Sequence, residues 1–273
     1  MRIKTKDGFL LDAVFNKIEG SKKGIIFAHG ITVNKNDEGF FNRAEVKSND
    51  LGFSTIRFDF RAHGKSSGDS VSDFNISGEL IDLETIVQFM KDEGIRDLNL
   101  AGASFGGGIS ALFAGRNVSQ IKSLLLVNPV LDFEKTFLKP TTPWAKKYFE
   151  NSLKQTEKGG FAEIGSRKYK VGKKFLDELK TYKPYKELDR YRNPLLMIHG
   201  DKDTKVPCQV TIDVFKSLAN KNKRIEIIKG SEYGFHEEPF ETRVVNLIVD
   251  FFRSTDSGFA GSSHCKAGWQ ISP

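Results

Sequence analysis

This sequence has no long apolar run: no hydrophobic segment approaches the roughly 20 residues that a membrane-spanning helix needs. Its N-terminus carries charges where a secretory leader would need an apolar stretch. Cysteine is scarce too, since Cys208 and Cys265 form no disulfide framework and neither has neighbours typical of a metal site. We therefore expect a cytoplasmic protein that uses no membrane, no metal and no other cofactor.

A concentrated charge of one sign is also missing. The chain has 42 Lys and Arg against 35 Asp and Glu, a net charge of +7, but the two signs are interspersed. No basic helix and no aromatic RNA-binding motif accompanies this excess, which argues against nucleic acid as a partner. The length allows one substantial core with a small subdomain, and nothing in the sequence signals an oligomeric state.

Strand-like and helix-like segments alternate along the chain, which is typical of a mainly parallel sheet covered by helices. An N-terminal hairpin over 2–16 is expected to turn at Asp7-Gly8, a favoured two-residue turn. Apolar residues at helical spacing predict helices around 40–51, from Ile76 to Met90 and from Val244 to Phe252. The further expected strands are 24–28, 54–59, 98–101, 123–127, 195–198 and 224–228.

The segment 131–192 is too long for a simple crossover between two of these strands. It contains 11 aromatic residues, and its 16 Lys and Arg against 9 Asp and Glu account for the whole charge excess. A hairpin is expected around Gly165-Ser166. We interpret 131–192 as an inserted cap over the functional edge of a domain spanning 1–253. The polar, aperiodic segment 254–273 is interpreted as a flexible or artificial tail.

The strongest motif is Gly102-Ala103-Ser104-Phe105-Gly106, which matches G-x-S-x-G. It follows a strand and precedes a helical stretch, the setting that a nucleophile elbow requires. Small residues on both sides of the serine avoid clashes in so tight a turn, and the start of the helix stabilises negative charge nearby. Ser104 is therefore the candidate nucleophile, rather than an ordinary serine in a glycine-rich turn.

A catalytic serine needs a base that is held by a third group, and in this architecture the acid precedes the histidine along the chain. Residues 199–207, His-Gly-Asp-Lys-Asp-Thr-Lys-Val-Pro, follow the expected strand 195–198. Here the sequence resembles the α/β-hydrolase family over nearly all of 1–253, and most closely the bacterial feruloyl and cinnamoyl esterases and related carboxylesterases. The resemblance implies an α/β-hydrolase fold, with a mainly parallel eight-stranded sheet, and places the acid on Asp203. Asp201 is the competitor.

The loop after the last strand departs from the family pattern. Residues 230–236, Gly-Ser-Glu-Tyr-Gly-Phe-His, resemble the family's G-x-x-H-x-F, but the histidine position falls on Tyr233. A phenol with a pKa near 10 is a poor proton acceptor at neutral pH. Of the five histidines, His236 alone lies on this loop, and Gly234 beside it could let the loop bend inward. We predict His236 as the base; in the alternative, Tyr233 occupies the base position and the enzyme is crippled.

Two further motifs complete the resemblance. His29-Gly30-Ile31 follows the strand 24–28 and resembles the oxyanion turn of the same esterases, which implies the N–H groups of Ile31 and Phe105 as oxyanion donors. Residues 59–66 resemble the family's D-x-R-x-H-G-x-S loop, whose usual role is structural. We therefore do not expect His63 to be catalytic.

Together these residues predict a serine carboxylesterase that hydrolyses small carboxylic esters through an acyl-enzyme, with a small-molecule ester as its partner. The aromatic cap suggests a pocket for an aromatic acyl group such as a hydroxycinnamate, although the same aromatics would serve as the cap's own core. A catalytically silent hydrolase-fold binding protein is the alternative, and a peptidase or thioesterase would use the same machinery. The candidate substrate-binding residues are Trp144, Tyr148, Phe149 and Tyr169.

Overall fold

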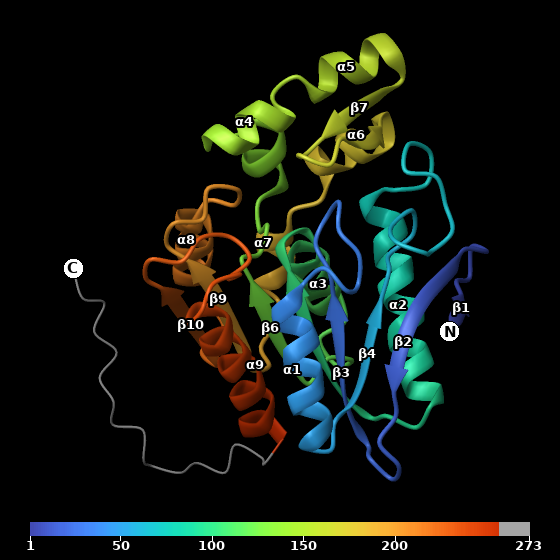
Figure 1. Ribbon diagram of the computed structural model, residues 1–273, viewed down its shortest axis with the longest axis vertical. Helices are drawn as coiled ribbons and strands as arrows, with labels where there is room; N and C mark the ends of the chain where they lie inside the picture. The colour runs from blue at the N-terminus through green and yellow to red at the C-terminus, as the bar shows by residue number, and fades with distance from the viewer. Residues whose placement is uncertain (257–273) are drawn as a thin grey trace.

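The computed structural model describes residues 1–256, and Figure 1 shows a twisted central sheet flanked by helices. The sheet has eight strands in the order β1-β2-β4-β3-β5-β6-β9-β10. β1 and β2 form the expected N-terminal hairpin, β2 runs antiparallel to β4, and the remaining pairs are parallel. The strands are β1 (Arg2–Lys4), β2 (Leu10–Asn16), β3 (Lys23–Ala28), β4 (Ser54–Phe58), β5 (Asp97–Ala103), β6 (Ser123–Val127), β9 (Leu195–Gly200) and β10 (Lys223–Ile228).

Helices cover both faces of this sheet, which explains why its central strands read as continuous apolar runs. Successive side chains of a strand point to opposite faces, so Leu124 and Leu126 pack into one core, whereas Leu125 and Val127 pack into the other. The first core lies under α2 (Ile76–Asp92) and α3 (Ser104–Arg116), and the second under α1 (Gly39–Asp50) and α9 (Phe240–Asp256). α8 (Cys208–Ser217) connects β9 to β10.

The chain between β6 and β9 builds a separate group of elements above the carboxyl ends of the parallel strands (Figure 1). Its hairpin pairs β7 with β8 in antiparallel register, and Gly165 has the positive φ that the tight turn requires. The last helix of this group, α7, packs against α3 in the main body. The elements are the π-helix η1 (Glu134–Leu138), α4 (Pro143–Phe149), α5 (Ser152–Gly159), β7 (Phe161–Ile164), β8 (Tyr169–Gly172), α6 (Lys173–Thr181) and α7 (Pro184–Leu188).

The C-terminal helix is longer than the sequence pattern indicated. α9 continues to Asp256, and Thr255 is buried against the core with its hydroxyl near Ser123. The first three residues of the expected tail 254–273 therefore belong to the helix, and the rest of that tail, Cys265 included, lies outside the described residues. Over residues 1–256, no helix is long and apolar enough to cross a bilayer. Cys208 is a free, half-buried thiol whose pKa burial raises to about 11.

Candidate active site

Ser104 occupies the turn between β5 and α3, and its backbone has the left-handed φ of +52°. A non-glycine residue in this region is strained, as expected of a nucleophile elbow. The flanking glycines allow a close approach of backbones: a Cβ on Gly106 would lie 2.1 Å from the carbonyl oxygen of His29, and one on Gly102 would lie 2.4 Å from the Ser110 hydroxyl. The spacing of the motif is therefore a packing requirement of this corner.

The expected oxyanion turn packs directly on the serine. A Cβ on Gly30 would lie 3.1 Å from the Cβ and 3.6 Å from the Oγ of Ser104. Two contacts fix the ring of His29. Its Nε2 accepts a hydrogen bond from the backbone N–H of Phe60, and its Nδ1 contacts the carbonyl oxygen of Gly30. Neither the N–H of Ile31 nor that of Phe105 donates a hydrogen bond to another described residue. Their role as oxyanion donors, which the resemblance implies, stays a prediction.

Asp203 follows β9 and is buried, and its two carboxylate oxygens differ. Oδ1 accepts the backbone N–H groups of Lys205 and Val206, at 2.8 and 2.9 Å. Oδ2 has no hydrogen-bond partner among the described residues. The Nε2 of His199 lies 3.2 Å from Oδ2, but its hydrogen goes to the carbonyl oxygen of Val206. Asp203 thus keeps one buried carboxylate oxygen without a hydrogen-bond partner among the described residues.

Asp201, the competing acid, lies in a different environment. Its side chain is exposed, and Oδ1 accepts the backbone N–H of Gly230 at 2.7 Å. This contact ties the loop after β9 to the loop after β10, which is a structural role.

Tyr233, on the loop between β10 and α9, lies next to Ser104. Burial raises the pKa of its phenol above the ordinary value, and the nearby charges of Glu38 and Asp203 raise it further. The hydroxyl therefore stays protonated at neutral pH and does not act as the proton acceptor that a serine nucleophile needs.

His236 lies on the same loop but on its solvent side. Its side chain is exposed, and Nε2 lies so close to Gly234 that a Cβ there would be 2.4 Å away. No hydrogen bond or ion pair joins its ring to Ser104, to Asp203 or to another residue of the described chain. The structure thus brings Ser104, Asp203 and Tyr233 together and leaves His236 outside this group. Its role as the base stays a prediction.

Glu38 is a site residue that the sequence analysis missed. It precedes α1, at a position where a side chain often caps the helix, yet its carboxyl makes no capping hydrogen bond. Instead, Oε1 accepts the N–H of Gly30 at 3.3 Å, within the oxyanion turn. Only 6% of the residue is exposed, and this burial raises the pKa of the carboxyl to about 7. No motif indicates such a residue, because its contact with Gly30 depends on the fold.

A lysine also lies at the site. The Nζ of Lys205 is 4.1 Å from the centroid of the Tyr233 ring and 5.6 Å from that of Trp144, which belongs to α4. Burial lowers the pKa of this ammonium, although the negative charges of Asp203 and Glu38 oppose the shift. The site therefore contains a cation that is partly removed from water, next to the tyrosine that contacts Ser104.

The loop after β4 has the structural role that the resemblance implied. Asp59 accepts hydrogen bonds from Lys35 and from the backbone of Lys65, and Arg61 forms ion pairs with Asp7 and Asp82. His63, on the same loop, is buried, and burial lowers the pKa of its imidazole to about 3.

The four cap aromatics fall into two groups. Trp144 and Tyr148 are half-buried on α4, and Trp144 faces Lys205. Phe149 is buried against Phe137, and Tyr169 stacks on His63 while its hydroxyl donates to the carbonyl oxygen of Ala62. The contacts of this second pair hold the cap together and anchor it, so Trp144 and Tyr148 are the better candidates for substrate contacts.

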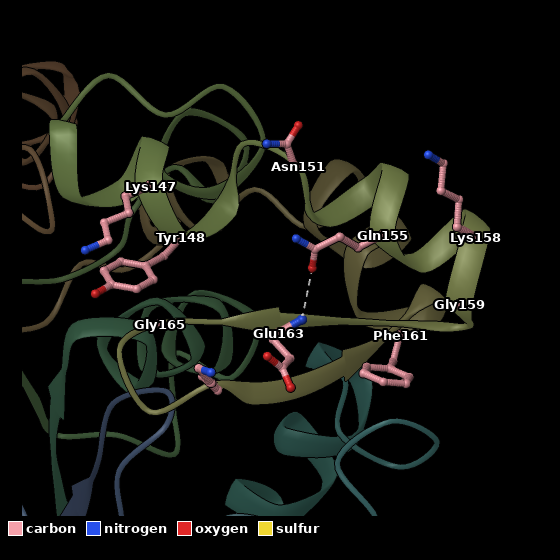
Figure 2. Close-up of a pocket in the computed structure, with 10 residues that line it drawn as sticks. Lys147, Tyr148, Asn151, Gln155, Lys158, Gly159, Phe161, Glu163 and Gly165 are labelled. Atoms are coloured by element: carbon pink, nitrogen blue, oxygen red, sulfur yellow. Dashed lines mark hydrogen bonds between the residues drawn. The ribbon is translucent and has the colours of Figure 1, made fainter.

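A cleft of about 710 Å³ lies within the cap, between α4, α5 and the β7–β8 hairpin (Figure 2). Lys147 and Tyr148 extend from α4 at one end, and Lys158 lies at the other. The hairpin turn brings this cleft near the oxyanion turn, because a Cβ on Gly165 would lie 3.6 Å from the side chain of Thr32. Tyr148 is the one cap aromatic of the four predicted that lines the cleft.

This arrangement has a strained serine, two N–H donors without partners and a buried acid, but within residues 1–256 no histidine ring forms a hydrogen bond with Ser104. Binding of a carbonyl group at the oxyanion turn needs only the donors. Rapid transfer of an acyl group also needs a base. The geometry therefore separates the two functions of a hydrolase site.

Comparisons with known proteins agree with this geometry. The family model described as alpha/beta hydrolase fold matches residues 24–163, just over half of the chain. Est1E from Butyrivibrio proteoclasticus, in a structure with bound ferulic acid, is 22% identical, with a TM-score of 0.78 over 94% of this chain and 99% of that one. At this identity the structural likeness shows the fold, and the expected fold class is confirmed.

Two curated relatives match at similar identity. Non-heme chloroperoxidase CPO-A1 of Kitasatospora aureofaciens is 24% identical in an alignment 277 positions long, gaps included. This alignment covers 89% of this chain and 95% of that protein. Monoacylglycerol lipase ABHD6 of Bos taurus is 23% identical over 270 residues, which cover 87% and 77%. The names of these two relatives denote different reactions, so the likeness extends to the fold and not to one substrate.

Proposed function

Because the chain belongs to the α/β-hydrolase fold family, we propose that Ser104 is the acyl acceptor of a site for small carboxylic esters. We further propose that the site hydrolyses these esters far more slowly than an intact triad would. The protein is then a serine hydrolase in its binding geometry, with an impaired step of proton transfer.

One observation carries this proposal: Tyr233 contacts Ser104 while Oδ2 of Asp203 has no hydrogen-bond partner among residues 1–256. In a complete triad, an imidazole accepts the serine proton and donates its other N–H to the acid. A neutral phenol does neither at neutral pH, because its raised pKa keeps the proton on its own oxygen.

The affected step is the attack on the ester. The Oγ of Ser104 forms a bond to the carbonyl carbon, the carbonyl oxygen gains negative charge, and the serine proton must move to a base. The N–H groups of Ile31 and Phe105 support the oxyanion. Without an acceptor for the proton the barrier stays high, and the departing alcohol also lacks its proton donor.

The test is labelling by a fluorophosphonate probe together with hydrolysis of p-nitrophenyl acetate. We expect weak labelling of the unaltered protein, none in Ser104→Ala, and a large gain of hydrolysis in Tyr233→His. His236→Ala should leave the slow rate unchanged. Fast hydrolysis by the unaltered protein that is lost in His236→Ala would contradict the proposal.

That contrary outcome defines the second candidate, a carboxylesterase with His236 as its base. Its support is that the ring of His236 makes no recorded hydrogen bond in the described chain, so no polar contact holds it at its exposed position. Two residues of positive φ, Gly234 and Phe235, precede it on a loop that would have to rearrange.

Hydroxycinnamoyl esters are the proposed aromatic substrates under either candidate. Trp144 and Tyr148 on the cap support this class, as does the likeness in fold to a protein whose structure holds ferulic acid. Methyl ferulate and methyl acetate, compared on the Tyr233→His variant, test it. Equal values of kcat/KM would exclude an aromatic preference.

A further inference from the structure

Lys205 stands between the main body and the cap. It follows Asp203 on the loop between β9 and α8, and its Nζ lies against the face of the Tyr233 ring, with Trp144 of the cap beyond it. Since the phenol of Tyr233 contacts Ser104, the ammonium lies one aromatic ring away from the nucleophile. Any ester bound at Ser104 therefore lies close to this cation.

The ammonium of Lys205 lacks the partners that a lysine of this burial usually has. Within residues 1–256 its Nζ forms no hydrogen bond and no ion pair, and its recorded contacts are with the two aromatic rings. Lys35, another lysine removed from water, pairs with both Asp12 and Asp59, at 2.5 and 2.8 Å. A half-buried cation without an acceptor favours a negatively charged ligand.

The carboxylates of Asp203, Glu38 and Glu232 also act on Lys205, but the hydrogen-bond donors around Ser104 have the same preference for a negatively charged ligand. With a phenol in place of an imidazole, the groups around Ser104 include its own hydroxyl, the hydroxyl of Tyr233 and the free N–H groups of Ile31 and Phe105, all of which can donate hydrogen bonds. The cleft in the cap contributes Lys147, Lys158 and Lys168 against one acidic residue, Glu163. Positive charge on the surface near a site attracts anionic ligands.

We propose that the site takes an ester that carries a carboxylate, and that Lys205 binds this carboxylate. The inference rests on the proposed function, since it assumes that the ester group lies at Ser104. It adds a substrate class: small acidic esters, with the carboxylate about one aromatic ring's width from the reacting carbonyl.

Binding measured by titration calorimetry tests this without any turnover. The two probes are monoethyl succinate and ethyl succinamate, which have the same shape but differ by one negative charge. The unaltered protein should bind the acid about tenfold more tightly or better, because a charge-assisted hydrogen bond replaces a neutral one. Added salt should weaken this preference.

Variants of one loop supply the controls. Lys205→Met should abolish the preference, Lys205→Arg should retain most of it, and Lys202→Met should leave it intact, because Lys202 is exposed on the same loop. If Lys205→Met is too unstable to measure, Lys205→Gln and the salt dependence give the same decision. Equal affinity for the two probes, no binding of either, or a preference that survives in Lys205→Met overturns the inference.

The two proposals can fail separately. Monoethyl succinate should protect Ser104 from the fluorophosphonate probe in the unaltered protein. Tight, Lys205-dependent binding without protection would leave the anion site standing and refute Ser104 as the ester site. Protection by both probes alike would support the ester site and refute the role of Lys205.

Discussion

The two sides of this site differ in how closely their residues match the family pattern. On the side of β3 and β5, Ser104 has a strained positive φ, and the N–H of Ile31 donates to no other described residue. On the side of β9 and β10, the acid is in place but a tyrosine stands where an imidazole is expected. In the proposed function, the first side would bind and polarise a carbonyl group, and the second would move protons. The comparison teaches that these two tasks depend on separate parts of the fold.

The first prediction restores the altered side. Tyr233→His should raise hydrolysis of p-nitrophenyl acetate by about 100- to 10,000-fold, the usual contribution of a general base. The new imidazole would meet the unused Oδ2 of Asp203 on one side and Ser104 on the other. Initial rates at pH 7.5 measure the gain.

Tyr233→Phe is the matched control, because it removes the hydroxyl without adding a base, and it should stay slow. Adding Asp203→Asn to Tyr233→His should cancel most of the gain, since the imidazole loses its orienting acid. A Tyr233→His variant no faster than the unaltered protein would contradict the assignment of Tyr233 to the base position.

The second prediction concerns a substitution on the side of β3 and β5. Gly106→Ala should destabilise the protein by about 2–3 kcal/mol, because the added methyl would collide with the carbonyl oxygen of His29 in a rigid corner. Urea unfolding measures the change. Gly159→Ala is the control, since a Cβ there meets no atom within 4 Å. Equal stability of the two variants would mean that the elbow tolerates side chains.

The third prediction concerns pH and Glu38, which lies between the two sides. Its pKa of about 7 is above the ordinary value near 4.5, so the folded state holds this proton more tightly than the unfolded state. Its contribution to stability is therefore fully present below pH 4.5 and is lost as the pH rises toward 7. The loss amounts to about 3 kcal/mol.

Glu38→Gln should remove this loss. The free energy of unfolding is measured for both proteins at pH 5 and at pH 7.5. Between these two pH values, the variant should gain stability relative to the unaltered protein. A parallel dependence in both proteins would show that the carboxyl is ionised throughout this range.

The smallest expected effect concerns the cap. Tyr169→Phe should cost about 1 kcal/mol, because it removes one hydrogen bond to the carbonyl oxygen of Ala62 and keeps the ring stacked on His63. Thermal unfolding measures it, with Tyr148→Phe as the control, whose hydroxyl makes no recorded hydrogen bond in the described chain. An equal effect of the two changes would deny the anchoring role of Tyr169.

Much of the fold was predictable, because local pattern and burial agree along the strands. The apolar runs 24–28 and 123–127 became β3 and β6, and the hairpin around Gly165 formed as its turn residues indicate. The end of α9 was not predictable, because the residues after Phe252 are polar and continue no apolar helical pattern. The last turn of the helix nevertheless packs on Ser123.

The site shows the same division between local and long-range information. The sequence by itself determined the elbow, because glycine at positions 102 and 106 is dictated by a clash that any side chain there would cause. It also placed a tyrosine where a histidine is usual. Only the tertiary structure decided that Tyr233 contacts Ser104, that His236 faces solvent, and that Glu38 and Lys205 join the site. These contacts link residues far apart in the chain, and such pairings follow from packing between elements, which no local pattern encodes.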